Sequence, residues 1–258
     1  MIEAWRRIAS LIGLAACSGA DPEPFCPDGT VIAAGETYGS LFDATTRTGG
    51  GLVTVCAGTF PGRDSIYAES DMRVEGAGVG VTVFDGEEDG YDGNSILTGD
   101  SLVPLALSGM TLRGGFAVYN VDESIGGGFG GGVSTGASEL AVTNVEIRDN
   151  VATWSAGLAV AAAPADGSRP AITITDSRIV SNTAYRDGGA FTLQGPGTVT
   201  LVNVDLGTPG VDDNTPNDIA FFDGLPTEEG WLDYEPVAVY SFDGVVSVTC
   251  VWETRTCE

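Results

Sequence analysis

The sequence contains no histidine and no lysine, since all eleven basic residues among its 258 are arginine. The absence of histidine excludes Ser-His-Asp and Cys-His catalysis and histidine-ligated zinc. The absence of lysine excludes Schiff-base chemistry and the phosphate-binding lysine of a P-loop. Basic charge is scarce, because 36 acidic residues leave a formal net charge of −25. That charge repels nucleic-acid phosphates and anionic lipids, so neither is an expected partner of the protein surface.

Long apolar runs are also missing, and twelve prolines argue further against a protein built from long helices. Glycine is abundant instead: 38 of 258 residues, about twice the usual ~7%. With 43% hydrophobic residues the chain can still bury a core. This composition favours many short strands joined by turns, and no second domain is evident.

The first sixteen residues have the pattern of a signal peptide, with Arg6 and Arg7 before a short apolar stretch. The tetrapeptide at 14–17, Leu-Ala-Ala-Cys, resembles the lipobox of bacterial lipoproteins. The resemblance implies cleavage before Cys17, acylation of its sulfur and, with Ser18 following, anchoring in the outer membrane. Residues 17–25 would be the lipidated cysteine and a tether, and residues 26–258 the folded domain. An ordinary secretory signal with a chance cysteine is the alternative.

Four further cysteines remain in a chain that we expect to be exported: Cys26, Cys56, Cys250 and Cys257. An even number of cysteines in an exported chain indicates disulfides, and four cysteines allow three pairings. We favour Cys26–Cys56 and Cys250–Cys257, because each pair joins neighbours at one end of the domain. A zinc site is the rival interpretation, although no Cys-x-x-Cys pair exists.

An internal repeat runs through the domain, with the pattern apolar-x-apolar-x-small-x-x-apolar. Its six units begin at Val53, Met72, Leu105, Leu140, Ile172 and Val199. Alternation predicts a short strand with one buried face, and the small, Asn or Asp residue predicts a sharp bend. Such a unit cannot bury its face alone, so we expect successive coils to stack as parallel strands. Asn144, Asp176 and Asn203 would then form a hydrogen-bonded ladder at the bend.

A second repeat overlaps two central units: Ile147-x-x-Asn150 leads to Ala156-Gly157-Leu158, and Ile179-x-x-Asn182 leads to Gly188-Gly189-Ala190. It resembles the FxxN and GGA[ILV] repeats of chlamydial polymorphic outer-membrane proteins, with Ile in place of Phe. That resemblance covers about two coils and implies adhesion.

The N-terminal part of the domain has a resemblance of its own. Three segments look like the first coil of pectin-lyase-like proteins: Cys26-Pro-Asp-Gly-Thr30, the spaced residues Tyr38, Leu41, Phe42 and Thr45, and the stretch 53–60. The resemblance implies a short amphipathic helix that caps the open end, and the spacing of Tyr38, Leu41, Phe42 and Thr45 suits one face of that helix. We therefore predict an all-β, single-stranded right-handed parallel β-helix with a short N-terminal capping helix. Residues 211–244 lack the repeat and are expected to form loop-rich closing coils before a terminal strand pair.

Two acidic stretches are candidate cation sites. Asp85, Glu87, Asp89 and Asp92 match the first half of a calcium loop, but Ile96 stands where the bidentate glutamate would be. A solvated loop is the alternative. Residues 211–218 carry five acidic or amide side chains, and Asx-turns explain them without a metal. No cofactor is required by the sequence, and calcium is the one that it allows.

Catalysis and binding have weaker candidates. Polysaccharide lyases of this fold use an arginine as the base. The candidate catalytic residues here are on neighbouring coils: Arg148, Asp149, Asp176 and Arg178. Arg113 occupies the position in its coil that is equivalent to Arg148. The local signatures of known pectinolytic enzymes are absent. Trp154 and Tyr185, if exposed, could stack on sugars; covering the core is the alternative.

The sequence therefore predicts a non-enzymatic, monomeric cell-envelope lipoprotein that acts as an adhesin-like binding module. Its expected partners are the membrane, through the lipid anchor, and a polysaccharide or another surface protein. The module would face the periplasm or the cell surface. A calcium-dependent lyase or hydrolase with a lateral groove is one alternative, and a purely structural envelope protein is another.

Overall fold

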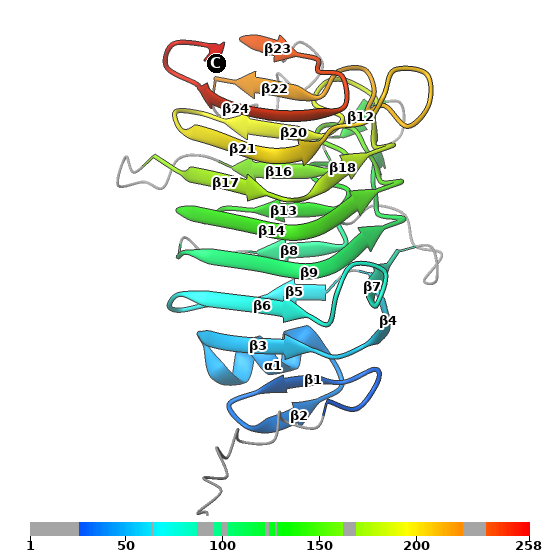
Figure 1. Ribbon diagram of the computed structural model, residues 1–258, viewed down its shortest axis with the longest axis vertical. Helices are drawn as coiled ribbons and strands as arrows, with labels where there is room; N and C mark the ends of the chain where they lie inside the picture. The colour runs from blue at the N-terminus through cyan, green and yellow to red at the C-terminus, as the bar shows by residue number, and fades with distance from the viewer. Residues whose placement is uncertain are drawn as a thin grey trace, which may run out of the picture.

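The computed structural model describes residues 26–62, 64–86, 95–99, 103–121, 124–126, 128–161, 169–223 and 236–258. They wind into a parallel β-helix whose two largest sheets lie one in front of the other (Figure 1). The predicted fold class, a single-stranded right-handed parallel β-helix with a short N-terminal helix, is confirmed. Within the described part of the chain, no helix is long and apolar enough to cross a membrane.

The larger sheet has thirteen described strands. They are β1 (Val31–Ala33), β2 (Glu36–Tyr38), β3 (Gly51–Val55), β4 (Gly58–Pro61), β6 (Met72–Gly76), β7 (Thr82–Asp85), β9 (Leu105–Arg113), β14 (Glu139–Arg148), β17 (Ala171–Thr175), β18 (Arg178–Val180), β21 (Thr198–Asp205), β24 (Val245–Val251) and β25 (Thr256–Cys257). The strands from β3 to β21 pair in parallel, and antiparallel strands close both ends.

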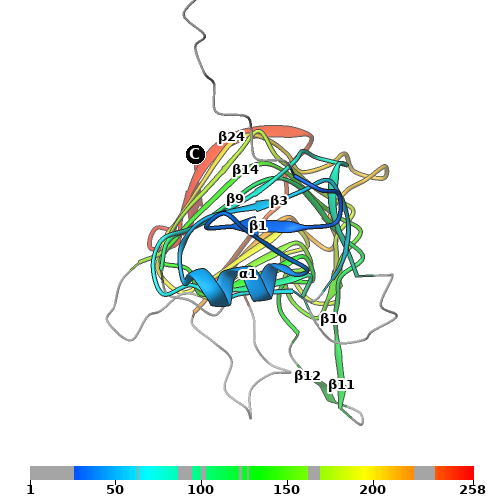
Figure 2. The same ribbon diagram turned by 90° about the horizontal axis from the view of Figure 1, so that it is seen from below.

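The sheet behind it has seven described strands: β5 (Asp64–Ile66), β8 (Leu97–Gly99), β13 (Val133–Thr135), β16 (Leu158–Ala161), β20 (Phe191–Gln194), β22 (Ile219–Phe222) and β23 (Ala238–Tyr240). A narrow sheet joins β10 (Phe116–Ala117), β15 (Val151–Ala152) and β19 (Thr183–Ala184). The pair β11 (Tyr119–Val121) and β12 (Ser124–Gly126) projects from the coil (Figure 2).

Strand register confirms where the repeat units start, from the second unit onward. Met72, Leu105, Leu140, Ile172 and Val199 pair in one row across five adjacent strands. All five side chains are at most 5% exposed, because alternation along each strand turns every second residue into the core. Stacking of the coils thus buries a face that no single coil could bury by itself.

The first two repeat units each depart from the predicted register at one position. Val53 pairs with Val74 rather than with Met72, and Phe84 rather than Val79 pairs with Leu112. The second of these departures comes from an insertion after Gly76, a loop with glycine at positive φ at 78 and 80, which moves the next inward residue to Phe84. Val79 is left 40% exposed as a result.

A left-handed bend divides the larger sheet into two faces. Gly109, Asn144, Asp176 and Asn203 have φ of 63°, 52°, 48° and 54°, a conformation that glycine, Asn and Asp tolerate best. We call the residues before the bend the front face and those after it, on β4, β7, β18 and the ends of β9, β14 and β21, the side face. Asn203 Nδ2 donates to Asp176 Oδ1 at 2.6 Å. The amide of Asn144 makes no hydrogen bond in the described part of the chain, so the predicted continuous ladder is wrong.

A continuous ladder exists elsewhere, at the asparagines of the second repeat. Asn150 Nδ2 donates to Asn182 Oδ1 at 2.9 Å, and Asn182 Nδ2 donates to Asn214 Oδ1 at 3.0 Å. All three are buried, and each also donates to a backbone carbonyl of a neighbouring coil. Asn214 is a third equivalent position in a stretch that showed no repeat, because only the asparagine persists there.

Glycines of the second repeat are required by close approach of the coils. A Cβ at Gly157 would lie 2.3 Å from the Ala190 carbonyl oxygen, and one at Gly189 would lie 2.7 Å from the Thr215 nitrogen. Gly188 adds a positive φ of 73°. The corner between coils therefore has room only for backbone, which explains the Gly-Gly-Ala pattern physically.

Helix α1 (Leu41–Thr48) covers the N-terminal end of the coil (Figure 2). Ser40 accepts from the Asp43 N–H as the N-cap, and Asp64 accepts from the Leu41 and Phe42 N–H groups at 2.8 Å each. Its buried residues are Leu41, Ala44 and Thr45. Phe42 is 48% exposed, so its predicted place on the buried face of the helix is wrong. Tyr38, predicted on the same face, belongs to β2.

Both predicted disulfides are present. Cys26–Cys56 fixes the start of the domain to the loop between β3 and β4, and Cys250–Cys257 staples the antiparallel pair β24–β25. This arrangement replaces the zinc alternative, since bonded cysteines are not free thiolate ligands. The two ends of the β-helix are therefore both covalently closed.

Candidate functional site

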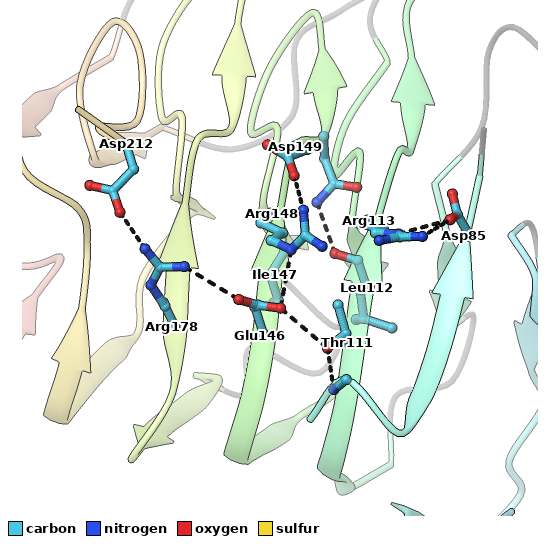
Figure 3. Close-up of polar contacts among 12 residues, drawn as sticks. Asp85, Thr111, Leu112, Arg113, Glu146, Ile147, Arg148, Asp149, Arg178 and Asp212 are labelled. Atoms are coloured by element: carbon cyan, nitrogen blue, oxygen red, sulfur yellow. Dashed lines mark hydrogen bonds and ion pairs between the residues drawn. The ribbon is translucent and has the colours of Figure 1, made fainter. Parts of the chain in front are cut away.

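The predicted catalytic candidates converge on the side face, where two rows of side chains cross the coils. One row contains Thr111, Glu146, Arg178 and Asp205, and the next contains Asp85, Arg113 and Arg148. Register places these residues side by side because parallel strands stack without stagger. Figure 3 shows that acidic and basic side chains alternate across the face and point toward one another.

Arg178 is the centre of this network. Its Nε lies 3.0 Å from Asp205 Oδ2 and its Nη1 lies 3.3 Å from Glu146 Oε1, while Nη2 pairs with Asp212. Burial alone would lower the pKa of the guanidinium. Hydrogen bonds from Arg178 to Asp205 and Glu146, and the nearby negative charges, outweigh burial and raise the pKa. Arg178 therefore stays protonated.

Arg148 is held in the same way. Its Nε donates to Glu146 Oε2 at 3.1 Å, and its Nη1 pairs with Asp149. Burial opposes the charged form here too, but the two carboxylates raise the pKa of Arg148 above its usual value. An arginine that acts as a base must lose its proton, so these ion pairs act against the predicted catalytic role.

The predicted calcium loop is described only in part. Asp85 is 4% exposed and accepts from Arg113 Nε at 2.8 Å. Glu87, Asp89 and Asp92 lie outside the described residues. A cation that used Asp85 would have to compete with Arg113 for this carboxylate. Among the residues that the structure describes, no group of three or more His, Cys, Asp or Glu side chains is arranged to hold a metal.

The second acidic stretch, residues 211–218, forms hydrogen bonds and ion pairs that stabilise the fold. Asp212 pairs with Arg178, and Asn214 completes the buried ladder. Asp218, which is 1% exposed, accepts from Asn214 Nδ2 at 3.0 Å and from the Phe242 N–H at 2.6 Å. Burial raises the pKa of Asp218 to about 6, although both hydrogen bonds oppose the shift. These contacts tie the last coil to the closing segment.

The two predicted sugar-stacking residues differ. Trp154 is 1% exposed and packs edge-on against Phe222 with ring centroids 5.4 Å apart. Trp154 is therefore not an exposed platform, and the alternative that it covers the core holds, because the indole packs with Ala220, Phe222 and Phe129. Tyr185 is 57% exposed and remains available for contact.

A groove that the sequence did not reveal lies at the bend between the front and side faces. This corner groove has a volume of about 320 Å³. It is lined by the bend residues Asn144, Asp176 and Asn203, by part of the Arg178 network, and by Val79 and Val245 at its ends. Glu146 and Asp205 were not singled out from the sequence, since only the register of the strands places them beside Arg178.

The comparisons with known proteins add no relative. No protein-family profile, curated protein or solved structure matches this chain. The resemblances to bacterial lipoproteins and to polymorphic outer-membrane proteins stay predictions, and Cys17 with the rest of residues 1–25 lies outside the described residues.

Proposed function

We propose that this chain is a non-enzymatic cell-envelope lipoprotein whose β-helix is an adhesin-like binding module that contacts glycans through the corner groove. The observation that carries the proposal is a contrast between neighbouring surfaces. On the side face, the arginines and carboxylates neutralise one another in ion pairs. In the groove, the exposed Asn144 amide makes no hydrogen bond to a described residue. Such groups suit the hydroxyl groups of a sugar.

The same contrast weakens the lyase alternative. A lyase needs an unprotonated base that takes a proton from the substrate, and the pKa of both candidate arginines is raised by their partners, which keeps them protonated. The ion pairs also hold the groove wall rigid across three coils. A wall held by ion pairs beside the Asn144 amide supports binding by preorganisation.

The geometry of the ends suits attachment at the N-terminus. The expected tether of residues 17–25 leads to Cys26, whose disulfide to Cys56 passes any pull directly to the first coil. The closing strands β23, β24 and β25 lie at the opposite end of the β-helix from β1 and β2 (Figure 1). A lipid on Cys17 would leave the C-terminal end and the groove projecting from the membrane.

The test is binding and turnover measured together on the full chain in detergent. Immobilised neutral and acidic polysaccharides would be scored for retention, and the solution for unsaturated products and new reducing ends. Asn144→Gly and Asp176→Gly remove groove side chains without strain, because glycine stands at the equivalent bend position 109. Ser181→Gly is the matched control, since Ser181 also has positive φ, 54°, but does not line the groove.

We expect retention of a neutral polysaccharide, its loss in both groove variants, normal retention in the control and no product. Product that disappears in Arg148→Ala or Arg178→Ala would make the protein an enzyme and refute the proposal. Equal retention of all variants would refute the role of the groove.

A further inference from the structure

The front face carries an uncharged array of small side chains. Two rows cross β9, β14, β17 and β21 in register: Ala106, Ala141, Thr173 and Thr200 form one, and Ser108, Thr143, Thr175 and Val202 form the other. We call these eight residues the front-face array. In a protein with 36 acidic residues it contains no charge. Charged residues only border it: Arg73 and Glu75 on β6, Glu139 two residues before Ala141 on β14, and Asp176 directly after Thr175.

The array is regular because the β-helix sets its spacing. Neighbouring strands are ~4.8 Å apart and alternate residues along a strand are roughly 6.7 Å apart. Thr143 and Thr173 are exposed, while Thr175 and Thr200 are half-buried. Their hydroxyl groups make no hydrogen bond with any residue that the structure describes. Each threonine therefore presents one methyl group and one unpaired hydroxyl to water on a rigid frame.

We propose that the front-face array is an ice-binding surface. Charged side chains hold liquid water in disordered shells, whereas fixed rows of methyl and hydroxyl groups can order water into a lattice. The rows repeat on a scale close to that of the oxygen rows on a prism face of ice. The array contains no amide or carboxylate side chain of the kind that lines the corner groove, which favours ice over a polysaccharide. This surface is separate from the corner groove and does not depend on it.

The test uses the purified full chain, with detergent alone as the blank. Two readouts are measured: entry of the protein into a slowly grown ice hemisphere, and the gap between melting and freezing temperatures of single crystals. Thr173→Glu and Thr143→Glu place a charge within the array. Thr59→Glu, at an exposed strand threonine on β4 outside it, makes the same charge change as a control. Far-UV circular dichroism verifies the fold of every variant.

We expect the wild type and Thr59→Glu to enter ice and to separate the melting and freezing temperatures. Both array variants should be excluded from ice and should show no more separation of the two temperatures than the detergent blank. Exclusion of the wild type from ice would overturn the proposal. So would equal behaviour of Thr173→Glu and Thr59→Glu. Retention on insoluble cellulose that Thr173→Glu abolishes, without entry into ice, would assign the face to a carbohydrate and overturn it as well.

Discussion

The asparagine ladder should be the most sensitive polar element of the fold, and Asn182→Ala tests it at its middle rung. The Asn182 carboxamide donates to the Ile147 carbonyl at 3.1 Å and to Asn214 Oδ1 at 3.0 Å. It accepts from Asn150 N–H at 3.2 Å and Asn150 Nδ2 at 2.9 Å. Alanine removes all four bonds at a site with no exposed surface.

The cost follows from which partners remain satisfied. Asn150 Nδ2 keeps the Leu112 carbonyl, and Asn214 Oδ1 keeps the Asn182 N–H. The Asn150 N–H is left without its acceptor and the Ile147 carbonyl loses a donor. Each unsatisfied buried group costs about 1–3 kcal/mol. With the small cavity added, we expect about 4 kcal/mol, a large share of the ~5–15 kcal/mol that stabilises a typical domain.

Urea unfolding followed by circular dichroism and tryptophan fluorescence measures this loss. Asn203→Gly is the matched control, because Asn203 is an exposed asparagine at a left-handed bend that glycine also accepts. We expect the control to change stability by less than about 1 kcal/mol. If Asn182→Ala cost no more than Asn203→Gly, the ladder would not be the stabilising element that its geometry indicates.

Three further predictions concern the buried carboxyl group of Asp218, the ion pairs of Arg178 and the lipid anchor on Cys17. The pKa of Asp218, raised to about 6 from 3.8, means that the folded state holds a proton that the unfolded state has released. Stability should therefore fall by up to about 3 kcal/mol as pH rises from about 4 to 6, and unfolding of Asp218→Asn should lose this pH dependence; an unchanged slope would refute it. Arg178→Gln leaves Asp205 and Asp212 without their ion-pair partner, while Glu146 keeps Arg148, and should cost about 1 kcal/mol at low salt. That cost should shrink in 1 M NaCl, and a salt-independent loss would contradict the electrostatic explanation. Cys17→Ser should abolish incorporation of labelled palmitate in the producing bacterium, whereas Cys26→Ser should retain it. Labelling that survives in Cys17→Ser would refute the anchor.

The sequence alone was sufficient for the architecture, because a β-helix repeats a local pattern. Alternating apolar residues and a bend residue recur in each coil, and the first residues of five of the six predicted units stack in one row as predicted. Both disulfides could also be predicted from the sequence, because each joins two cysteines at the same end of the domain.

Tertiary structure decided everything that depends on which residues face each other across coils. The insertion after Gly76 moves the last inward residue of the second unit from Val79 to Phe84, and an alternating pattern cannot reveal an inserted loop. Exposure of Trp154 and Asn203 could not be read from spacing, because the loop at Trp154 folds inward while the bend at Asn203 faces solvent. The partners of Arg178 come from three different segments, 146, 205 and 212, and only stacking brings them together. A local code thus specifies the coil, whereas the chemistry of its surface arises between coils.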